Sequence, residues 1–458
     1  MRLTCAGAAR TVTGSCHHLV VGDLSLLVDC GLFQGGAELE ARNRRAFPFV
    51  ASDLDHVLVT HGHLDHVGRL PLLVREGYGG SFHATPATCA LAAIILRDSA
   101  KIQEEDHARE LRKAVRAGRE AEVPAPLYTM TDAERAIERF RPIDYDRPLR
   151  LGEGVVVTYR QAGHILGSAY LEIEAEGGRI TFSGDLGNRE SSLHLPAVPP
   201  RGSDVIVLES TYGDRNHRTR AATRSEFLSV VTSAVTRGGN VMIPTFAVER
   251  AQQILYEIYS LVAEGAMTDL PVYLDSPMAT NVTKLYQQGV AELRPEVARV
   301  FEAGGDPFDP PSLTFTPDAE SSKKLNDVHG GAVIIAASGM MTGGRILHHL
   351  KHNLWREQAS LVIVGYQAEG TLGRALIDGA KRVRIHGDEI AVRASIHTIN
   401  GFSAHADKDD LLGFLGASNG AHVLLVHGEE KVMESFAAVV EATGRRTTLP
   451  VMDQPIDL

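Results

Sequence analysis

The chain has 458 residues, of which 44% are hydrophobic, and a formal net charge of −11. This length exceeds the roughly 250 to 300 residues that one hydrophobic core usually serves, so we expect two domains, and no apolar run approaches the roughly 18 residues of a transmembrane helix. The acidic balance argues against a nucleic acid held by overall charge, although bound divalent metals and local basic patches can still attract phosphates.

The N-terminal segment does not resemble a signal peptide. Residues 1–10 run into glycine and arginine without an apolar core. The cysteines are spread along the chain without a Cys-x-x-Cys pair, at Cys5, Cys16, Cys30 and Cys89. This spacing argues against a zinc knuckle and is typical of a reduced chain. We therefore expect a cytoplasmic protein with no membrane partner.

Strands and a helix are predicted in the first part of the chain. Residues 19–30 predict a β-hairpin that turns at Gly22 and Asp23. Residues 54–59 form an apolar, valine-rich run that predicts a buried strand. The apolar spacing within residues 67–76 predicts a helix packed on a sheet.

Three histidines and an aspartate lie between this strand and this helix, within six residues: His61, His63, Asp65 and His66. A rigid scaffold often presents reactive side chains on loops at strand ends. Imidazole and carboxylate are ligands of Zn²⁺, so His61 and His63 can point to one ion while Asp65 and His66 point to another. A solvated loop with fortuitous histidines is the weaker interpretation, because so many ligand types fall so close together.

The pattern of predicted helices and strands changes along the rest of the chain. Residues 98–139 are highly charged and helical in pattern, which predicts a surface elaboration, and a β-rich stretch follows at 155–185. Beyond Glu209 strands and helices alternate, which predicts a parallel, doubly wound sheet. A strand at 423–426 and an amphipathic helix at 431–441 then suggest that the C-terminal segment rejoins the metal-bearing domain.

Two further residues suit a metal site by their context. His164 and Asp185 each lie in a glycine-flanked loop at a predicted strand end. Taken singly, each is more often an ordinary loop residue. Beside the first cluster, we interpret both as metal ligands.

These residues resemble, in order, the four motifs of metallo-β-lactamase-fold hydrolases: Asp29, the run His61 to His66, His164 and Asp185. Later residues narrow the resemblance to the β-CASP nucleases: Glu209 in Leu-Glu-Ser-Thr-Tyr-Gly, His405 in Phe-Ser-Ala-His-Ala-Asp and His427 in Val-His-Gly-Glu. The chain is most similar in appearance to bacterial relatives of the nuclease subunit of the cleavage and polyadenylation specificity factor. In that family a histidine at the position of His427 is carried by members that cut RNA.

The resemblance implies an α/β fold, in which a metallo-β-lactamase αββα sandwich is interrupted by a parallel, doubly wound β-CASP domain that caps the metal site. It places the N-terminal part of the sandwich at residues 1–213, the inserted domain at 214–391 and the C-terminal part of the sandwich at 392–458.

The resemblance also implies two zinc ions. One takes His61, His63 and His164, the other takes Asp65, His66 and His427, and Asp185 bridges them, while Asp29 orients a ligand histidine. Seven ligands leave positions for water and substrate, and a bridging hydroxide would attack phosphorus. His405 is then the general acid, oriented by Glu209, so that the expected catalytic set is His405, Glu209, Asp65 and Asp185. Read alone, Glu209 would be a turn-capping carboxylate and His405 a residue at a helix start.

Glycine-rich turns in the inserted part predict phosphate contacts. Such turns after strands can aim backbone N–H groups at an anion, although many serve only tight packing. The candidates are Ser338, Gly339, Thr342, Gly343, Gly370 and Thr371.

The leading hypothesis is a zinc-dependent ribonuclease that cuts single-stranded RNA endonucleolytically. The same residues would support 5′ to 3′ exonuclease action. A small-substrate hydrolase of the same metal fold is a second alternative, and a non-catalytic RNA-binding subunit is a third. The sequence leaves a homodimer open.

Overall fold

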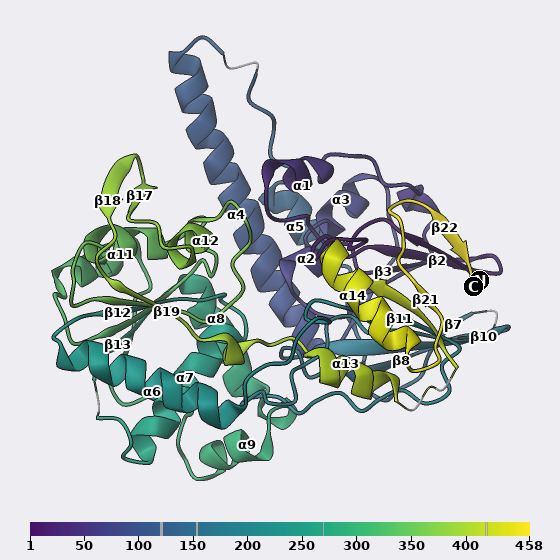
Figure 1. Ribbon diagram of the computed structural model, residues 1–458. Helices are drawn as coiled ribbons and strands as arrows, with labels where there is room; N and C mark the ends of the chain where they lie inside the picture. The colour runs from purple at the N-terminus through teal and green to yellow at the C-terminus, as the bar shows by residue number, and fades with distance from the viewer. Residues whose placement is uncertain (120–121, 153, 269, 417, 419) are drawn as a thin grey trace. The chain divides into compact units, whose positions relative to one another are not determined.

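The computed structural model describes residues 1–458 except 120–121, 153, 269, 417 and 419. The chain divides into two compact units (Figure 1). The first contains residues 1–187, 196–216 and 405–458, and the second contains 188–195 and 217–404. No helix among the described residues is both long enough and apolar enough to cross a membrane.

One seven-stranded sheet of the first unit has the order β22-β1-β2-β3-β4-β5-β6. Its strands are β1 (Arg2–Cys5), β2 (His17–Val21), β3 (Leu24–Val28), β4 (His56–Leu58), β5 (Phe82–Ala84), β6 (Phe140–Pro142) and β22 (Pro455–Asp457). The antiparallel pair β2–β3 is the expected hairpin. Strands β3 and β4 run parallel with Val28 opposite Leu58, so the segments that follow them meet at one edge of the sheet.

The other seven-stranded sheet has the order β21-β20-β11-β10-β9-β8-β7. Its strands are β7 (Leu149–Gly152), β8 (Val155–Gln161), β9 (Ala169–Ala175), β10 (Gly178–Phe182), β11 (Val205–Glu209), β20 (His422–Val426) and β21 (Thr447–Thr448). Strands β10, β11 and β20 are parallel, so their carboxyl ends also share an edge. The predicted return of the C-terminal segment is therefore seen in β20, which pairs with β11 across more than 200 residues of sequence.

The two sheets pack face to face. Leu19 and Leu26 of the first sheet share one buried cluster with Leu171 and Val207 of the second. The outer face of the second sheet is covered by α13 (Lys408–Leu415) and α14 (Glu430–Glu441), which share a buried cluster with β11 and β20. With helices α2 (Leu64–Val67), α3 (Leu70–Arg75), α4 (Pro86–Arg116) and α5 (Met130–Ile137) added, the unit is the expected αββα sandwich.

Helix α4 accounts for most of the charged surface elaboration. It begins earlier than the sequence pattern suggested, because Thr85 caps it by accepting a hydrogen bond from the Thr88 amide and Pro86 occupies the first turn. Its N-terminal half is buried through residues such as Leu91 and Leu96. Its C-terminal half has no buried residue after Ala100 and projects away from the sheets of this unit (Figure 1). The short helix α1 (Ala37–Arg42) also belongs to this unit.

The second unit is built on a six-stranded sheet of order β14-β13-β15-β12-β16-β19, in which every neighbouring pair is parallel. Its strands are β12 (Val241–Pro244), β13 (Val272–Asp275), β14 (Leu313–Phe315), β15 (Val333–Ala336), β16 (Ser360–Ile363) and β19 (Ser395–Thr398). Val241 and Ile243 pack with α6 (Arg220–Thr236) and α7 (Arg250–Ala263), whereas Met242 packs with α11 (Ile346–Asn353). Helices on both faces make this the expected doubly wound arrangement.

The second unit also contains the α-helices α8 (Pro277–Gln288), α9 (Pro295–Glu302), α10 (Ala319–Lys324) and α12 (Leu372–Ile377), and a hairpin of β17 (Arg382–Ile385) and β18 (Asp388–Ala391). Strand β19 pairs with β16, so the chain stays in this sheet as far as Thr398. The compact units thus divide near residue 404, and the limits 1–213, 214–391 and 392–458 remain a prediction about domains.

Candidate metal centre

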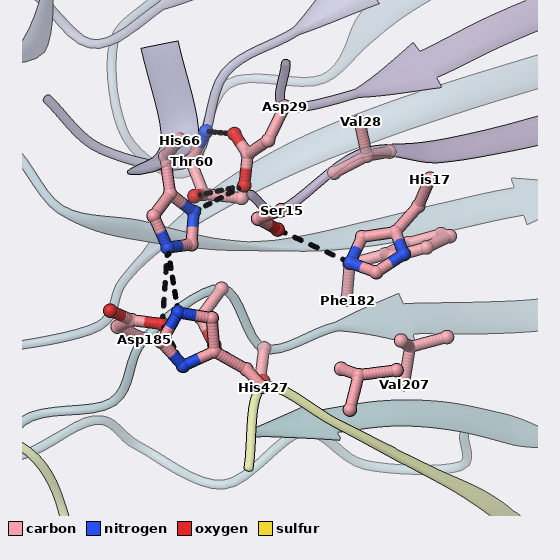
Figure 2. Close-up of a pocket in the computed structure, with 13 residues that line it drawn as sticks. Ser15, His17, Val28, Asp29, Thr60, His66, Phe182, Asp185, Val207 and His427 are labelled. Atoms are coloured by element: carbon pink, nitrogen blue, oxygen red, sulfur yellow. Dashed lines mark hydrogen bonds and ion pairs between the residues drawn. The ribbon is translucent and has the colours of Figure 1, made fainter. Parts of the chain in front are cut away.

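The loops after β3 and β4 place the first group of predicted residues at one sheet edge. Asp29 follows β3, and its carboxylate accepts hydrogen bonds of 2.8 Å from both the amide and the hydroxyl of Thr60. The same carboxylate lies 2.8 Å from Nδ1 of His66. This contact turns Nε2 of His66 toward Asp185 and His427 (Figure 2). Asp29 therefore holds one predicted ligand in a single orientation.

One group of four donor atoms meets above this edge. Nδ1 of His63 lies 3.1 Å from Nε2 of His61 and 3.2 Å from Nε2 of His164. Oδ2 of Asp185 lies 3.5 Å from the His61 nitrogen and 3.6 Å from the His164 nitrogen. Four donors placed tetrahedrally around Zn²⁺ at about 2.0–2.1 Å are separated by about 3.4 Å, so these spacings suit such an ion.

A second group lies on the other side of Asp185. Nε2 of His427 lies 3.4 Å from Nε2 of His66 and 3.4 Å from Oδ2 of Asp65. Oδ1 of Asp185 lies 3.4 Å from the same His66 nitrogen. The two oxygens of Asp185 thus face different donor groups, as a bridging carboxylate requires.

Asp185 supplies a separate test of the fit to metal. Its Oδ1 atom is buried and accepts no hydrogen bond among the residues that the structure describes. A buried carboxylate oxygen that accepts no hydrogen bond is costly, and a bound cation would compensate it. The donor set and this oxygen therefore fit a pair of metal ions shared through Asp185.

Burial and the neighbouring carboxylates together shift the pKa values of these histidines. It holds the pKa of His61 well below the usual range and lowers the pKa of His63 to about 4. At His66 burial acts in the same direction, but the carboxylates of Asp185 and Asp29 outweigh it and raise the pKa. Neutral imidazole is the form that binds a metal, so His61 and His63 are in the ligating form at neutral pH.

His405 and Glu209 form a pair beside the first donor group. Nδ1 of His405 lies 3.2 Å from Oε2 of Glu209 and 3.9 Å from Oδ2 of Asp185. Glu209 ends β11 fully buried, and its Oε1 accepts a 2.7 Å hydrogen bond from the amide of Leu186. Burial alone would lower the pKa of His405, but the charge and hydrogen bond of Glu209 outweigh it and raise this pKa to about 9. The imidazole edge that carries Nε2 is then the one that can present a proton.

Sequence analysis missed a small buried hollow behind the second donor group. It has a volume of about 10 Å³ and is lined by Ser15, His17 and Phe182 together with Asp29, His66 and His427 (Figure 2). His17 lies 3.2 Å from the Ser15 hydroxyl, and burial lowers the pKa of His17 to about 3. The volume suits about one water molecule. The polar residues in the run Thr13 to His17 were the signal that the sequence offered for this hollow.

The predicted phosphate-binding turns lie in the second unit. In the turn between β15 and α11, the Ser338 hydroxyl accepts hydrogen bonds of 3.1 and 3.3 Å from the amides of Thr342 and Gly343. Gly339 lies in the same turn, and helix α11 begins only at Ile346. Thr371, after Gly370, caps α12 by accepting from the amide of Arg374. Ser338 thus already occupies two of the donors expected to meet a phosphate, and phosphate binding here stays a prediction.

Comparison with known proteins identifies the family. Residues 10–224 match the metallo-beta-lactamase superfamily, 251–376 match the Beta-Casp domain, and 389–450 match a Zn-dependent metallo-hydrolase RNA specificity domain. A protein of Thermus thermophilus named Ribonuclease TTHA0252 is 44% identical over 98% of both chains. The chain is a β-CASP member of the metallo-β-lactamase superfamily. It is accordingly a metal-dependent hydrolase, as the sequence predicted.

Two other similarities agree with this assignment. A protein of Methanocaldococcus jannaschii named Transcription termination factor FttA is 32% identical over 99% of this chain and 71% of its own length. A crystal structure of a protein of unknown function from Enterococcus faecalis covers 100% of this chain and 99% of its own, with a TM-score of 0.58 and 13% identity. At that identity the likeness concerns the fold alone.

Proposed function

We propose that this β-CASP protein is a zinc-dependent ribonuclease that hydrolyses phosphodiester bonds of single-stranded RNA endonucleolytically. The observation that carries the proposal is the sharing of Asp185 between two donor groups, with the His405–Glu209 pair beside it. The match to an RNA specificity domain and the likeness to a ribonuclease support RNA as the substrate. A cytoplasmic location and a homodimer stay predictions.

Each candidate residue has a distinct role in the proposed reaction. His61, His63 and His164 would hold one zinc ion, Asp65, His66 and His427 would hold the other, and Asp185 would contact both. Bound zinc would acidify a water molecule and neutralise charge on the phosphate oxygens. Glu209 keeps the His405 imidazole in one orientation through Nδ1, so that Nε2 can give a proton to the leaving oxygen. Asp29 keeps His66 turned toward the second ion.

Cleavage of labelled RNA tests the activity. The purified protein should cut internally labelled single-stranded RNA, and a chelator should abolish the reaction. A circular single strand separates the two modes of action, because it has no end for an exonuclease. We expect the circle to be opened. If the circle stays intact while a 5′-labelled linear strand is degraded, the protein is a 5′ to 3′ exonuclease and not an endonuclease. If neither RNA is cut, the proposed ribonuclease function is wrong.

Metal analysis tests the cofactor separately. Protein prepared without chelator should contain two zinc ions per chain. Replacing Cys5, Cys16, Cys30 and Cys89 by serine or alanine should leave this number unchanged, because none of them lies in the donor groups. A single ion at full occupancy would contradict the proposal that Asp185 contacts two ions.

A further inference from the structure

The loop between β1 and β2, residues 6–16, is attached to the second donor group by its backbone. The carbonyl of Ala8 accepts a 2.7 Å hydrogen bond from the amide of His427, and the amide of Ser15 donates a 2.8 Å hydrogen bond to the carbonyl of Asp65. Both partners are candidate ligands of the same ion. The loop is therefore held in a defined position beside that ion.

Arg10 is the one exposed residue of this loop. Residues 5–9 and 13–17 are buried and Thr11 and Val12 are half-buried, whereas the Arg10 side chain is 39% exposed. Its backbone has φ +57°, and that of Ala8 has φ +49°. Residues other than glycine rarely adopt this backbone conformation, and outliers of this kind concentrate at functional sites. Arg10 also lies only two residues from the carbonyl that contacts His427, which is about 7 Å at full extension.

The guanidinium of Arg10 pairs with the carboxylate of Glu430. Glu430 is the first residue of α14 and lies three residues after His427, so the pair spans the two segments next to the second donor group. Both side chains are substantially exposed, and exposed ion pairs contribute little to stability. A guanidinium binds phosphate through two parallel hydrogen bonds as it binds carboxylate, so a phosphate can compete with Glu430 for Arg10.

We propose that Arg10 binds a backbone phosphate of the RNA strand next to the scissile bond, on the side of Asp65, His66 and His427, and that Glu430 holds the guanidinium until RNA replaces the carboxylate. This inference rests on the proposed ribonuclease function. In a chain with a net charge of −11, a single well-placed arginine matters more for a polyanion than it would in a basic protein. The alternative is a purely structural pair that fastens the loop to α14.

Substitution of either Arg10 or Glu430 breaks the ion pair, but only substitution of Arg10 removes the proposed phosphate contact. The two substitutions therefore distinguish RNA binding from a purely structural role. Arg10→Ala should raise the KM for single-stranded RNA about 10-fold, with kcat within about twofold. It should also lower the salt dependence of log(kcat/KM) by about 0.7, the contribution of one phosphate contact on a single strand. Glu430→Gln should leave KM unchanged or lower it, since the guanidinium is released and a negative charge is removed. Arg10→Lys should fall between Arg10→Ala and the unsubstituted protein, because it keeps the charge and loses the paired hydrogen bonds.

The chain offers a matched control in the exposed pair of Arg2 and Asp457, at the other end of β1. Arg2→Ala and Asp457→Asn change the charge by the same amounts and should leave KM and the salt dependence unaltered. Equal effects of Arg10→Ala and Glu430→Gln would establish the structural pair and overturn the inference. An Arg10→Ala protein that behaves like Arg2→Ala would overturn it too. If the unsubstituted, zinc-loaded protein fails to cut RNA at all, the proposed function fails and this inference fails with it.

Discussion

At the scale of single residues, the pair of His405 and Glu209 separates metal binding from proton transfer. His405 contributes no atom to either four-donor group, and it lies 3.2 Å from a fully buried carboxylate. His405→Ala should therefore keep both metal ions and lose roughly 10²- to 10⁴-fold in cleavage rate, which is the usual contribution of a general acid. Metal content and single-turnover rate measure the two effects. Loss of metal in this variant would place His405 among the ligands.

His427 offers the contrasting case. Its Nε2 atom lies 3.4 Å from both His66 and Asp65, whereas the His61, His63 and His164 group lies on the other side of Asp185. His427→Ala should weaken one ion selectively and leave the other bound. Titration with a competing chelator should then show one weak and one tight site. Loss of both ions together would mean that the two groups bind as one unit.

At the scale of elements, glycines allow the loops of the centre to approach one another. A Cβ atom at Gly31, just after β3, would lie 1.5 Å from the carbonyl oxygen of Asp65. Gly31→Ala should therefore lower the free energy of unfolding by about 1–3 kcal/mol or more and reduce metal content. Gly413 is the control, because it lies in α13 with open space at its Cβ position, and Gly413→Ala should stabilise by about 0.4–1 kcal/mol. Chemical denaturation measures both, and equal effects would contradict the close approach.

The end of β13 carries a buried charge that should make the second unit sensitive to acid. Asp275 accepts hydrogen bonds of 2.6 Å from Ser322 and 2.7 Å from Arg345, and it lies 2.6 Å from His349. Burial acts to raise the pKa of Asp275, but these partners outweigh it and hold the pKa below its usual range. A lowered pKa contributes stability above the unfolded value of about 3.9 and loses it as the pH falls further.

Asp275→Asn should therefore destabilise the second unit at neutral pH and make its stability less dependent on pH below about 4. Thermal unfolding at several pH values measures this. Asp378 and Arg374 form an exposed pair in the same unit, and Asp378→Asn should change little. Identical acid sensitivity of Asp275→Asn and the unsubstituted chain would show that Asp275 does not set it.

At the scale of the whole molecule, the net charge of −11 governs how RNA can be held. Long-range attraction should be weak, so the strand must depend on few contacts. For single strands, the slope of log affinity against log salt concentration is about −0.7 for each neutralised phosphate. We expect this slope to have a magnitude below about 4. Duplex RNA should be cut more slowly, because a rigid A-form helix reaches the buried metal centre less readily than a flexible single strand does. A steeper slope, or equal cleavage of duplex, would mean that a larger basic surface takes part.

Much of the fold could be predicted from local sequence patterns. The valine-rich run before Thr60 and the apolar spacing after it correctly predicted a strand and a following helix, because such periods report which face of an element is buried. Asp65 and His66 were expected on the loop between them, but they lie in the short helix α2. The alternation beyond Glu209 correctly predicted a parallel sheet covered on both faces. The pattern was less informative for α4, whose first turns are apolar and whose start depends on the cap at Thr85.

The sequence by itself determined the residue types of the centre and the strand ends near which they lie, since ligand chemistry and local periodicity are properties of short segments. Only the tertiary structure decided which of them meet. Nε2 of His427 comes within 3.4 Å of Asp65 across 362 positions, and Glu209 reaches His405 across 196. Periodicity shows the face that a residue occupies but not its partner, because strand order and register depend on the packing of the whole sandwich. For the same reason, only the structure showed that the Ser338 hydroxyl accepts hydrogen bonds from amides expected to bind phosphate, and that Arg10 pairs with Glu430, three residues after His427.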